Sequence, residues 1–100
     1  MSLVVAGTIR VPAANLDGLR PHMLAMMAAT RAEDGCAAYS YAEDVAEPEL
    51  IHVFEVWRDQ AALDAHVKTP HMAAWRAQWP SFGVSERRLI AYEIASEREL

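Results

Sequence analysis

The sequence has almost nothing that could brace a small chain covalently, because Cys36 is the only cysteine among 100 residues. A disulfide within the chain is therefore excluded. A single thiol, with no secretory leader ahead of it, is typical of a reducing compartment, so we expect a cytoplasmic location. The apolar stretch from Leu3 to Ile9 is far too short to span a bilayer, and we expect no membrane partner.

Basic side chains are also scarce. Nine Lys and Arg residues are scattered among fourteen Asp and Glu residues, which gives a formal net charge of −5. Binding to the phosphates of a nucleic acid needs clustered basic side chains, so we expect no nucleic-acid partner. The length is that of one domain. We therefore expect a single domain over residues 1–100, with a core from about residue 3 to residue 95 and a polar C-terminal tail.

The hydrophobic pattern predicts strands that alternate with helical regions. Short β-branched and apolar runs predict strands at residues 2–11, 36–44, 50–57 and 84–95. Apolar residues three and four apart, together with capping residues, predict helical segments at residues 16–30, 59–66 and 69–79.

Pro21 complicates the start of the first helix. A proline in a helix interior costs about 3 kcal/mol or more, because it removes a hydrogen bond and clashes with the preceding turn. We therefore expect Asn15 to Gly18 to form a separate turn, with Asp17 near the true helix start, rather than one kinked helix. The segment from Pro80 to Gly83 is expected to break the last helix.

The predicted order of strand, helix, strand, strand, helix and strand is the ferredoxin-like α+β arrangement. Four antiparallel strands form its sheet, and the helices lie on one face. The strands are nevertheless apolar on both faces: in the strand at 50–57, Phe54 and Val56 point one way and Ile51 and Val53 the other. Helices can cover only one face, so we predict a homodimer formed through the open sheet faces.

Several residues recur here in an order and spacing that resemble the signature of the antibiotic biosynthesis monooxygenase family. The similarity extends from Leu3 to about Tyr92, and its most specific parts are the E-x-W and L-x-x-H-x-x-T-x-H patterns. The residues that carry it are Gly35, Cys36 and Tyr39, then Glu55, Val56 and Trp57, then Leu63, His66, Thr69 and His71.

The resemblance implies a dimeric α+β barrel in which the sheets of two protomers pack face to face. Members of the family include small oxygenases that act on aromatic phenols or quinols without metal, flavin or haem, whereas others degrade haem. The haem-degrading members carry an asparagine in the first strand and an iron-binding histidine late in the second helix. This sequence has Gly7 and Thr8 in that strand and Trp75 or Arg76 near that helical position, so we expect no cofactor.

Oxygenation without a cofactor needs an electron-rich substrate anion, an apolar cavity and a group that accepts a proton. His66 is the histidine that the resemblance places at the site, and we take it as the candidate catalytic residue; a hydrogen-bonded structural role is the alternative. Glu55 is the candidate orienting partner of its imidazole. The candidate substrate-binding residues are Trp57, Trp75, Tyr39 and Met23. The two tryptophans and Met23 could instead be ordinary core residues, and Tyr39 could be a half-exposed strand residue.

A metal site is not expected from the spacing of the histidines. His66 and His71 are five residues apart across a predicted break, which differs from the i, i+4 spacing of a zinc-binding helix face. His71, near a helix start, is interpreted as structural. The leading hypothesis is a cofactor-independent monooxygenase acting on a small aromatic phenol or quinol. The alternatives are a non-catalytic small-molecule-binding or stress-response barrel domain, and an isomerase or lyase that uses His66 as a proton shuttle.

Overall fold

The computed structural model describes residues 1–100 and shows a four-stranded antiparallel sheet with the strand order β2-β3-β1-β4. The elements along the chain are β1 (Leu3–Arg10), α1 (Ala13–Arg31), β2 (Cys36–Glu43), β3 (Leu50–Trp57), α2 (Gln60–Val67), α3 (Pro70–Phe82) and β4 (Ser85–Glu93). This is the predicted ferredoxin-like α+β fold.

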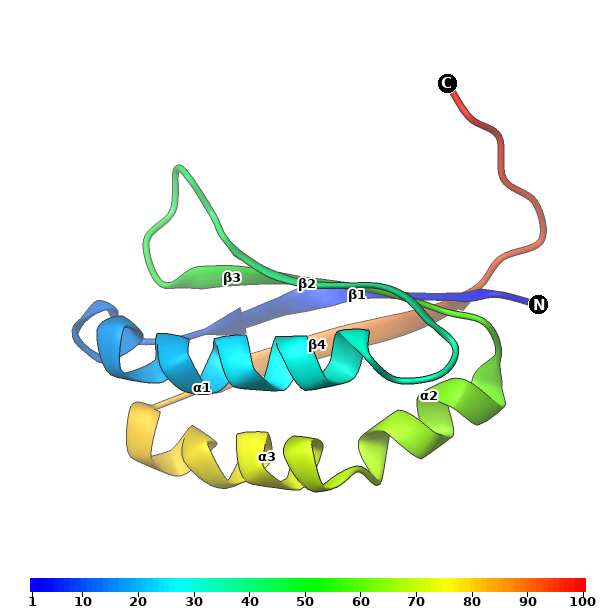
Figure 1. Cartoon of the computed structure of the whole chain (residues 1–100). Helices are drawn as coiled ribbons and strands as arrows, with labels where there is room; N and C mark the ends of the chain where they lie inside the picture. Colours follow the sequence, from blue (N-terminus) through cyan, green and yellow to red (C-terminus); the bar gives the residue numbers. More distant parts are fainter.

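The three helices lie together on one side of the sheet (Figure 1). The core fills the space between these two layers, and the inward-facing residues Ile51, Val53 and Trp57 of β3 are almost completely buried there. On the opposite side no helix covers the sheet, and Phe54 and Tyr92 remain 45% and 50% exposed. The strands are therefore apolar on both faces, as their sequence pattern indicated.

The first helix is longer than predicted and contains Pro21 in its interior. The expectation of a separate turn at Asn15–Gly18 is wrong, and Asp17 lies inside the helix. Pro21 is exposed, so water can satisfy the carbonyl group that loses its partner. Packing favours the continuous helix because the buried stripe extends to both sides of the proline. This stripe comprises Leu16, Leu19, Met23, Met26, Met27 and Thr30.

A glutamate from another part of the chain caps the start of this helix. Pro12 occupies the N-cap position and makes no side-chain capping bond. The backbone N–H of Ala13 instead donates to Oε2 of Glu49 at 2.7 Å, and the N–H of Val11 donates to the carbonyl oxygen of Glu49 at 3.0 Å. A remote carboxylate thus satisfies one of the free N–H groups at the start of the helix. This contact helps the helix to begin at Ala13 rather than near Asp17.

The last helix also contains a proline that does not end it. Helix α3 continues through Pro80 to Phe82. Of the expected break at Pro80–Gly83, only Gly83 lies outside the helix. Gly83 adopts a left-handed conformation with φ of 69°, which is the common way to end a helix. None of the helices is long and apolar enough to cross a membrane.

Candidate active site

The junction between α2 and α3 fixes the position of His66. Asp59 caps α2 by accepting the N–H of Ala62 at 2.9 Å. At the other end of the helix, the hydroxyl of Thr69 donates to the carbonyl oxygen of His66 at 2.8 Å and accepts the N–H of Met72 at 3.3 Å. Thr69 therefore closes the end of α2 and caps the start of α3, and these bonds hold His66 at a defined bend.

Two aromatic side chains enclose the imidazole of His66, which is only 2% exposed. The ring of Trp57 lies against it with centroids 4.6 Å apart, and the ring of Tyr39 meets it edge-on at 5.3 Å. Trp57 and Tyr39 were predicted to bind substrate. The structure places both in the core, against the imidazole.

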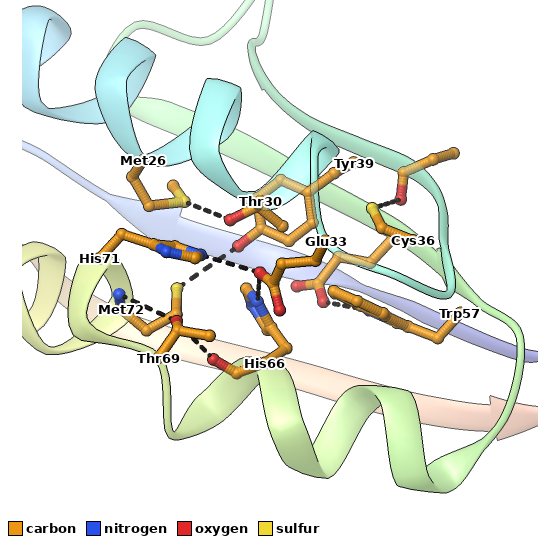
Figure 2. Close-up of polar contacts among 12 residues, drawn as sticks. Met26, Thr30, Glu33, Cys36, Tyr39, Trp57, His66, Thr69, His71 and Met72 are labelled. Carbon is orange, nitrogen blue, oxygen red and sulfur yellow. Dashed lines mark hydrogen bonds and ion pairs between the residues drawn. The ribbon is translucent and has the colours of Figure 1, made fainter.

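The direct partner of the imidazole is Glu33, in the loop after α1. Oε2 of Glu33 lies 2.7 Å from Nδ1 of His66 and 2.8 Å from Nε2 of His71 (Figure 2). The loop is held by backbone bonds, since Glu33 donates to the carbonyl of Thr30 and accepts the N–H of Cys36. One largely buried carboxylate oxygen therefore receives both histidines.

This contact determines which nitrogen of His66 can act as a base. An ionised carboxylate can only accept hydrogen bonds, so Nδ1 carries the proton that faces Glu33. In a neutral imidazole the other nitrogen, Nε2, then holds the free lone pair. No hydrogen bond engages Nε2 in the structure, which leaves it available to a ligand.

A cavity of about 280 Å³ lies between the sheet and the helices beside His66. Its wall is mostly apolar, with a few polar groups, as is usual for a small-molecule site. The sheet side includes Val5, Glu55 and Leu89, and the helix side includes Leu63, His66 and Met72.

Besides His66, the charged and phenolic residues that line the cavity are Glu55, Asp64, Arg87 and Tyr41. Burial raises the pKa of the Glu55 carboxyl above its ordinary value of 4.5, although the indole N–H of Trp57 donates to it at 2.9 Å. Burial likewise raises the pKa of the Tyr41 phenol. The guanidinium of Arg87 lies 5.5 Å from the ring centroid of Trp79. Arg87 also lines the cavity and supplies a positive charge at its wall.

The structure corrects several of the predicted site contacts. Glu55 shares the cavity with His66, but the carboxylate bound to the imidazole is Glu33. Trp75 lines a separate hollow of about 140 Å³ between α1 and α3, and Met23 lines a third of about 130 Å³. Trp57 and Tyr39 line none of the three, because the core encloses them. The four residues expected to form one substrate wall thus do not meet in one cavity.

Sequence reasoning missed Glu33 and Arg87 entirely. Glu33 lies in an irregular loop, and 33 residues separate it from His66. Arg87 has no motif around it and reaches the cavity only because β4 pairs with β1. The sequence predicts the break between the two helical segments, and the spacing across it gave no reason to expect His66 and His71 to meet. The structure shows that this bend turns both rings toward one carboxylate (Figure 2).

A family profile described as antibiotic biosynthesis monooxygenase matches residues 2–78 of the chain. The chain belongs to this family. It is 33% identical over 98 residues to the uncharacterized protein sll1783 of Synechocystis, across 98% of this chain and 67% of that protein. It is 45% identical over 60 residues to Rv0793 of Mycobacterium tuberculosis, which is named as a candidate monooxygenase, across 60% of this chain and 58% of that protein.

Solved structures of similar proteins have the same fold. A protein of Deinococcus radiodurans whose name places it in this family matches with a TM-score of 0.89 and 25% identity, over 100% of this chain and 98% of that chain. The structure of Rv0793 matches with a TM-score of 0.78 and 30% identity, over 99% of this chain and 98% of that chain. The likeness extends over the whole ferredoxin-like fold.

Proposed function

We propose that the protein is a cofactor-independent monooxygenase that oxidises a small aromatic phenol or quinol with O₂. The observation that carries this proposal is the buried pair of Glu33 and His66 beside the cavity, with Nε2 of the histidine unengaged. Membership of the family, and a relative named as a candidate monooxygenase, favour oxygenase chemistry. The small apolar cavity favours an aromatic substrate of modest size.

The first step is removal of a proton. Nε2 of His66 takes the phenolic proton, and the negative charge of Glu33 stabilises the imidazolium that forms. The guanidinium of Arg87 is the cationic group of the cavity wall and can stabilise the phenolate. Deprotonation matters because triplet oxygen reacts slowly with neutral closed-shell molecules, whereas a phenolate is rich in electrons.

The second step adds oxygen to a ring carbon that carries hydrogen, para to the phenolate in a simple phenol and ortho to it in a quinol. A carbon–oxygen bond forms there, and the imidazolium of His66 returns its proton to the resulting peroxide. The O–O bond then breaks as the hydrogen of that carbon leaves as a proton. One oxygen atom becomes the new carbonyl of a quinone and the other leaves as water. The substrate supplies all four electrons, so no further reductant is needed.

We also propose that the protein works as a homodimer that buries the open sheet face. Phe54 and Tyr92 are half exposed on this face, and β1 contributes Val4 and Ala6 between them in register. Monomers rarely expose a contiguous apolar patch of this kind. The cavity lies on the helical side of the sheet, so such a dimer leaves the site open.

Oxygen consumption tests the proposed function. Chelator-treated, flavin-free protein is mixed with a panel of quinols and para-unsubstituted phenols in an oxygen electrode. We expect one O₂ consumed for each quinone formed, with no hydrogen peroxide. His66→Gln should lose this activity, whereas the matched variant His52→Gln, which alters a histidine paired with Asp44 on the sheet face opposite the cavity, should keep it.

Two outcomes would replace the proposal with one of its alternatives. Exchange of substrate hydrogen with deuterium from the solvent, without oxygen uptake, would indicate an isomerase or lyase that uses His66 as a proton shuttle. Saturable binding of a phenol with neither exchange nor uptake would indicate a non-catalytic binding domain.

A further inference from the structure

We propose that Glu33, His66 and His71 form a binding site for a divalent transition-metal ion. Their candidate ligand atoms, one from each residue, all lie within 4.8 Å of one another. Zinc binds nitrogen and carboxylate oxygen at about 2.0–2.2 Å, which places ligand atoms roughly 3–3.5 Å apart around one ion. The contacts of 2.7 and 2.8 Å at Oε2 of Glu33 would therefore lengthen slightly, and the two histidine nitrogens, which lie within 4.8 Å of each other, would move together.

The three side chains come from three elements and converge on one point (Figure 2). Glu33 follows α1, His66 lies near the end of α2, and His71 lies in the first turn of α3. The hydrogen bonds of Thr69 fix the bend between the two histidines, and the ring of Trp57 packs against His66. Such support from surrounding groups orients metal ligands and strengthens binding.

The chemistry of the donor set selects the class of ion. Two imidazole nitrogens and one carboxylate oxygen suit Zn²⁺, Co²⁺, Ni²⁺ or Fe²⁺. Mg²⁺ and Ca²⁺ prefer sites made of oxygen ligands, so they fit poorly. Three protein ligands leave one position of a tetrahedron open. A water molecule or a small anion would occupy it.

Metal binding changes the state of His66. In the metal-free protein, Nδ1 of His66 and Nε2 of His71 carry the protons that face Glu33. A metal ion needs the lone pairs of these same nitrogens, so each ring proton must move to the other nitrogen of its ring or be lost. Nε2 of His66 then becomes an N–H donor and can no longer accept a proton. The metal-bound state and the basic state of His66 exclude each other.

Titration with Co²⁺ tests this site without reference to activity. The full chain is freed of metal with a chelator and titrated while its visible absorption is recorded. We expect one Co²⁺ per chain, with the intense d–d bands of a four- or five-coordinate ion, and displacement by Zn²⁺. His71→Gln and Glu33→Gln should weaken binding about tenfold or more. His52→Gln, which alters a histidine–aspartate pair on the open sheet face, opposite the helices, should bind as the unchanged protein does.

A second variant keeps the test decisive if the first two are unstable. His71→Cys supplies a thiolate at the same position, and a thiolate bound to Co²⁺ adds a charge-transfer band in the near ultraviolet. Its appearance would show that position 71 ligates the ion. The proposal is overturned if Co²⁺ keeps the weak spectrum of the hydrated ion, or if His52→Gln weakens binding as much as His71→Gln.

The outcome separates this site from the proposed oxygenase. Co²⁺ bound by this cluster in a protein that consumes no oxygen supports the metal site and contradicts the oxygenase. Oxygen uptake by a protein that gives no spectrum of bound Co²⁺ supports the oxygenase and contradicts the metal site. Where both hold, Zn²⁺ should inhibit oxygen uptake and a chelator should restore it.

Discussion

Nδ1 of His66 lies 2.7 Å from Oε2 of Glu33, and this contact joins the end of α2 to the loop after α1. The same carboxylate oxygen also receives His71 at the start of α3. A single side chain thus connects all three helices behind the cavity. Its removal should affect both the tautomer of His66 and the packing of the helices, and these two effects can be measured separately.

Replacement of Glu33 by glutamine should reduce turnover far more than it reduces stability. The glutamine oxygen can still accept a hydrogen bond, but it no longer stabilises an imidazolium. We expect kcat for oxygen uptake to fall about a hundredfold, within the range usual for general-base catalysis, together with a changed pH profile. Urea denaturation measures the accompanying loss of stability. The double variant with His66→Gln should be no slower than His66→Gln alone, because the two residues act as a unit.

The opposite pattern would make the cluster structural. If Glu33→Gln lowers the free energy of unfolding and leaves kcat and its pH profile unchanged, then the carboxylate only holds the helices together.

The arrangement of strands and helices was predictable because it depends on local patterns. The strand β3 follows from the alternation of its apolar residues, and the helix starts at Asp59 and Thr69 follow from those capping residues and the few residues after them. The structure confirms all three. The continuous helix through Pro21 was not predictable, because it depends on a cap from Glu49 and on burial along the whole helix.

The candidate site was predictable only in part for the same reason. His66 lies within a local motif on a helix with an apolar face, so the burial of its side chain between helix and sheet could be predicted. Its partner could not be foreseen, because the choice between Glu33 and Glu55 depends on which carboxylate a loop brings within hydrogen-bonding distance. Trp57 and Trp75 were expected to face inward, whereas the burial of Tyr39 was left open. Pattern alone does not distinguish a cavity wall from the core behind it.

Replacement of Glu55 by glutamine should stabilise the protein at neutral pH and not in acid. Burial raises the pKa of this carboxyl above 4.5, so the folded state binds the proton more tightly than the unfolded state does. The neutral carboxyl therefore favours folding below pH 4.5, and this benefit is lost as the pH rises through the raised folded pKa. Glutamine stays neutral and still offers an oxygen to the indole of Trp57.

Urea denaturation of both proteins at a series of pH values checks this expectation. The stability advantage of Glu55→Gln should be absent in acid and should grow through the weakly acidic range to a plateau. An advantage that is the same at every pH would mean that the charge of Glu55 is fully compensated in the folded protein.

Replacement of Gly7 by alanine should strongly destabilise the sheet. A Cβ atom at Gly7 would lie 1.9 Å from the backbone oxygen of Arg88, so β1 and β4 would have to separate. We expect a loss of about 3 kcal/mol in the free energy of unfolding, at the upper end of what overpacking usually costs. Gly18→Ala is the control, because its Cβ would meet only the ring of Phe82, at 2.8 Å, and a side chain can move. Equal losses in the two variants would contradict this account.

The homodimer should be disrupted by a charge on the open sheet face. The chain mass is 11.1 kDa, and light scattering should report about twice this value at micromolar concentration. Phe54→Glu places a carboxylate where an interface of about 800 Å² per partner would bury it, so the variant should dissociate or unfold. Leu24→Glu is the matched control, since Leu24 is 64% exposed on the helical side.

Unfolding gives an independent test of the same dimer. If two chains fold together, the midpoint of thermal unfolding should rise with protein concentration in the unchanged protein and in Leu24→Glu. Phe54→Glu, if it folds at all, should lose this dependence. A well-folded monomer whose midpoint is the same at every concentration would show that the open face is stable in water. The apolar residues outside the core would then need a reason other than self-association.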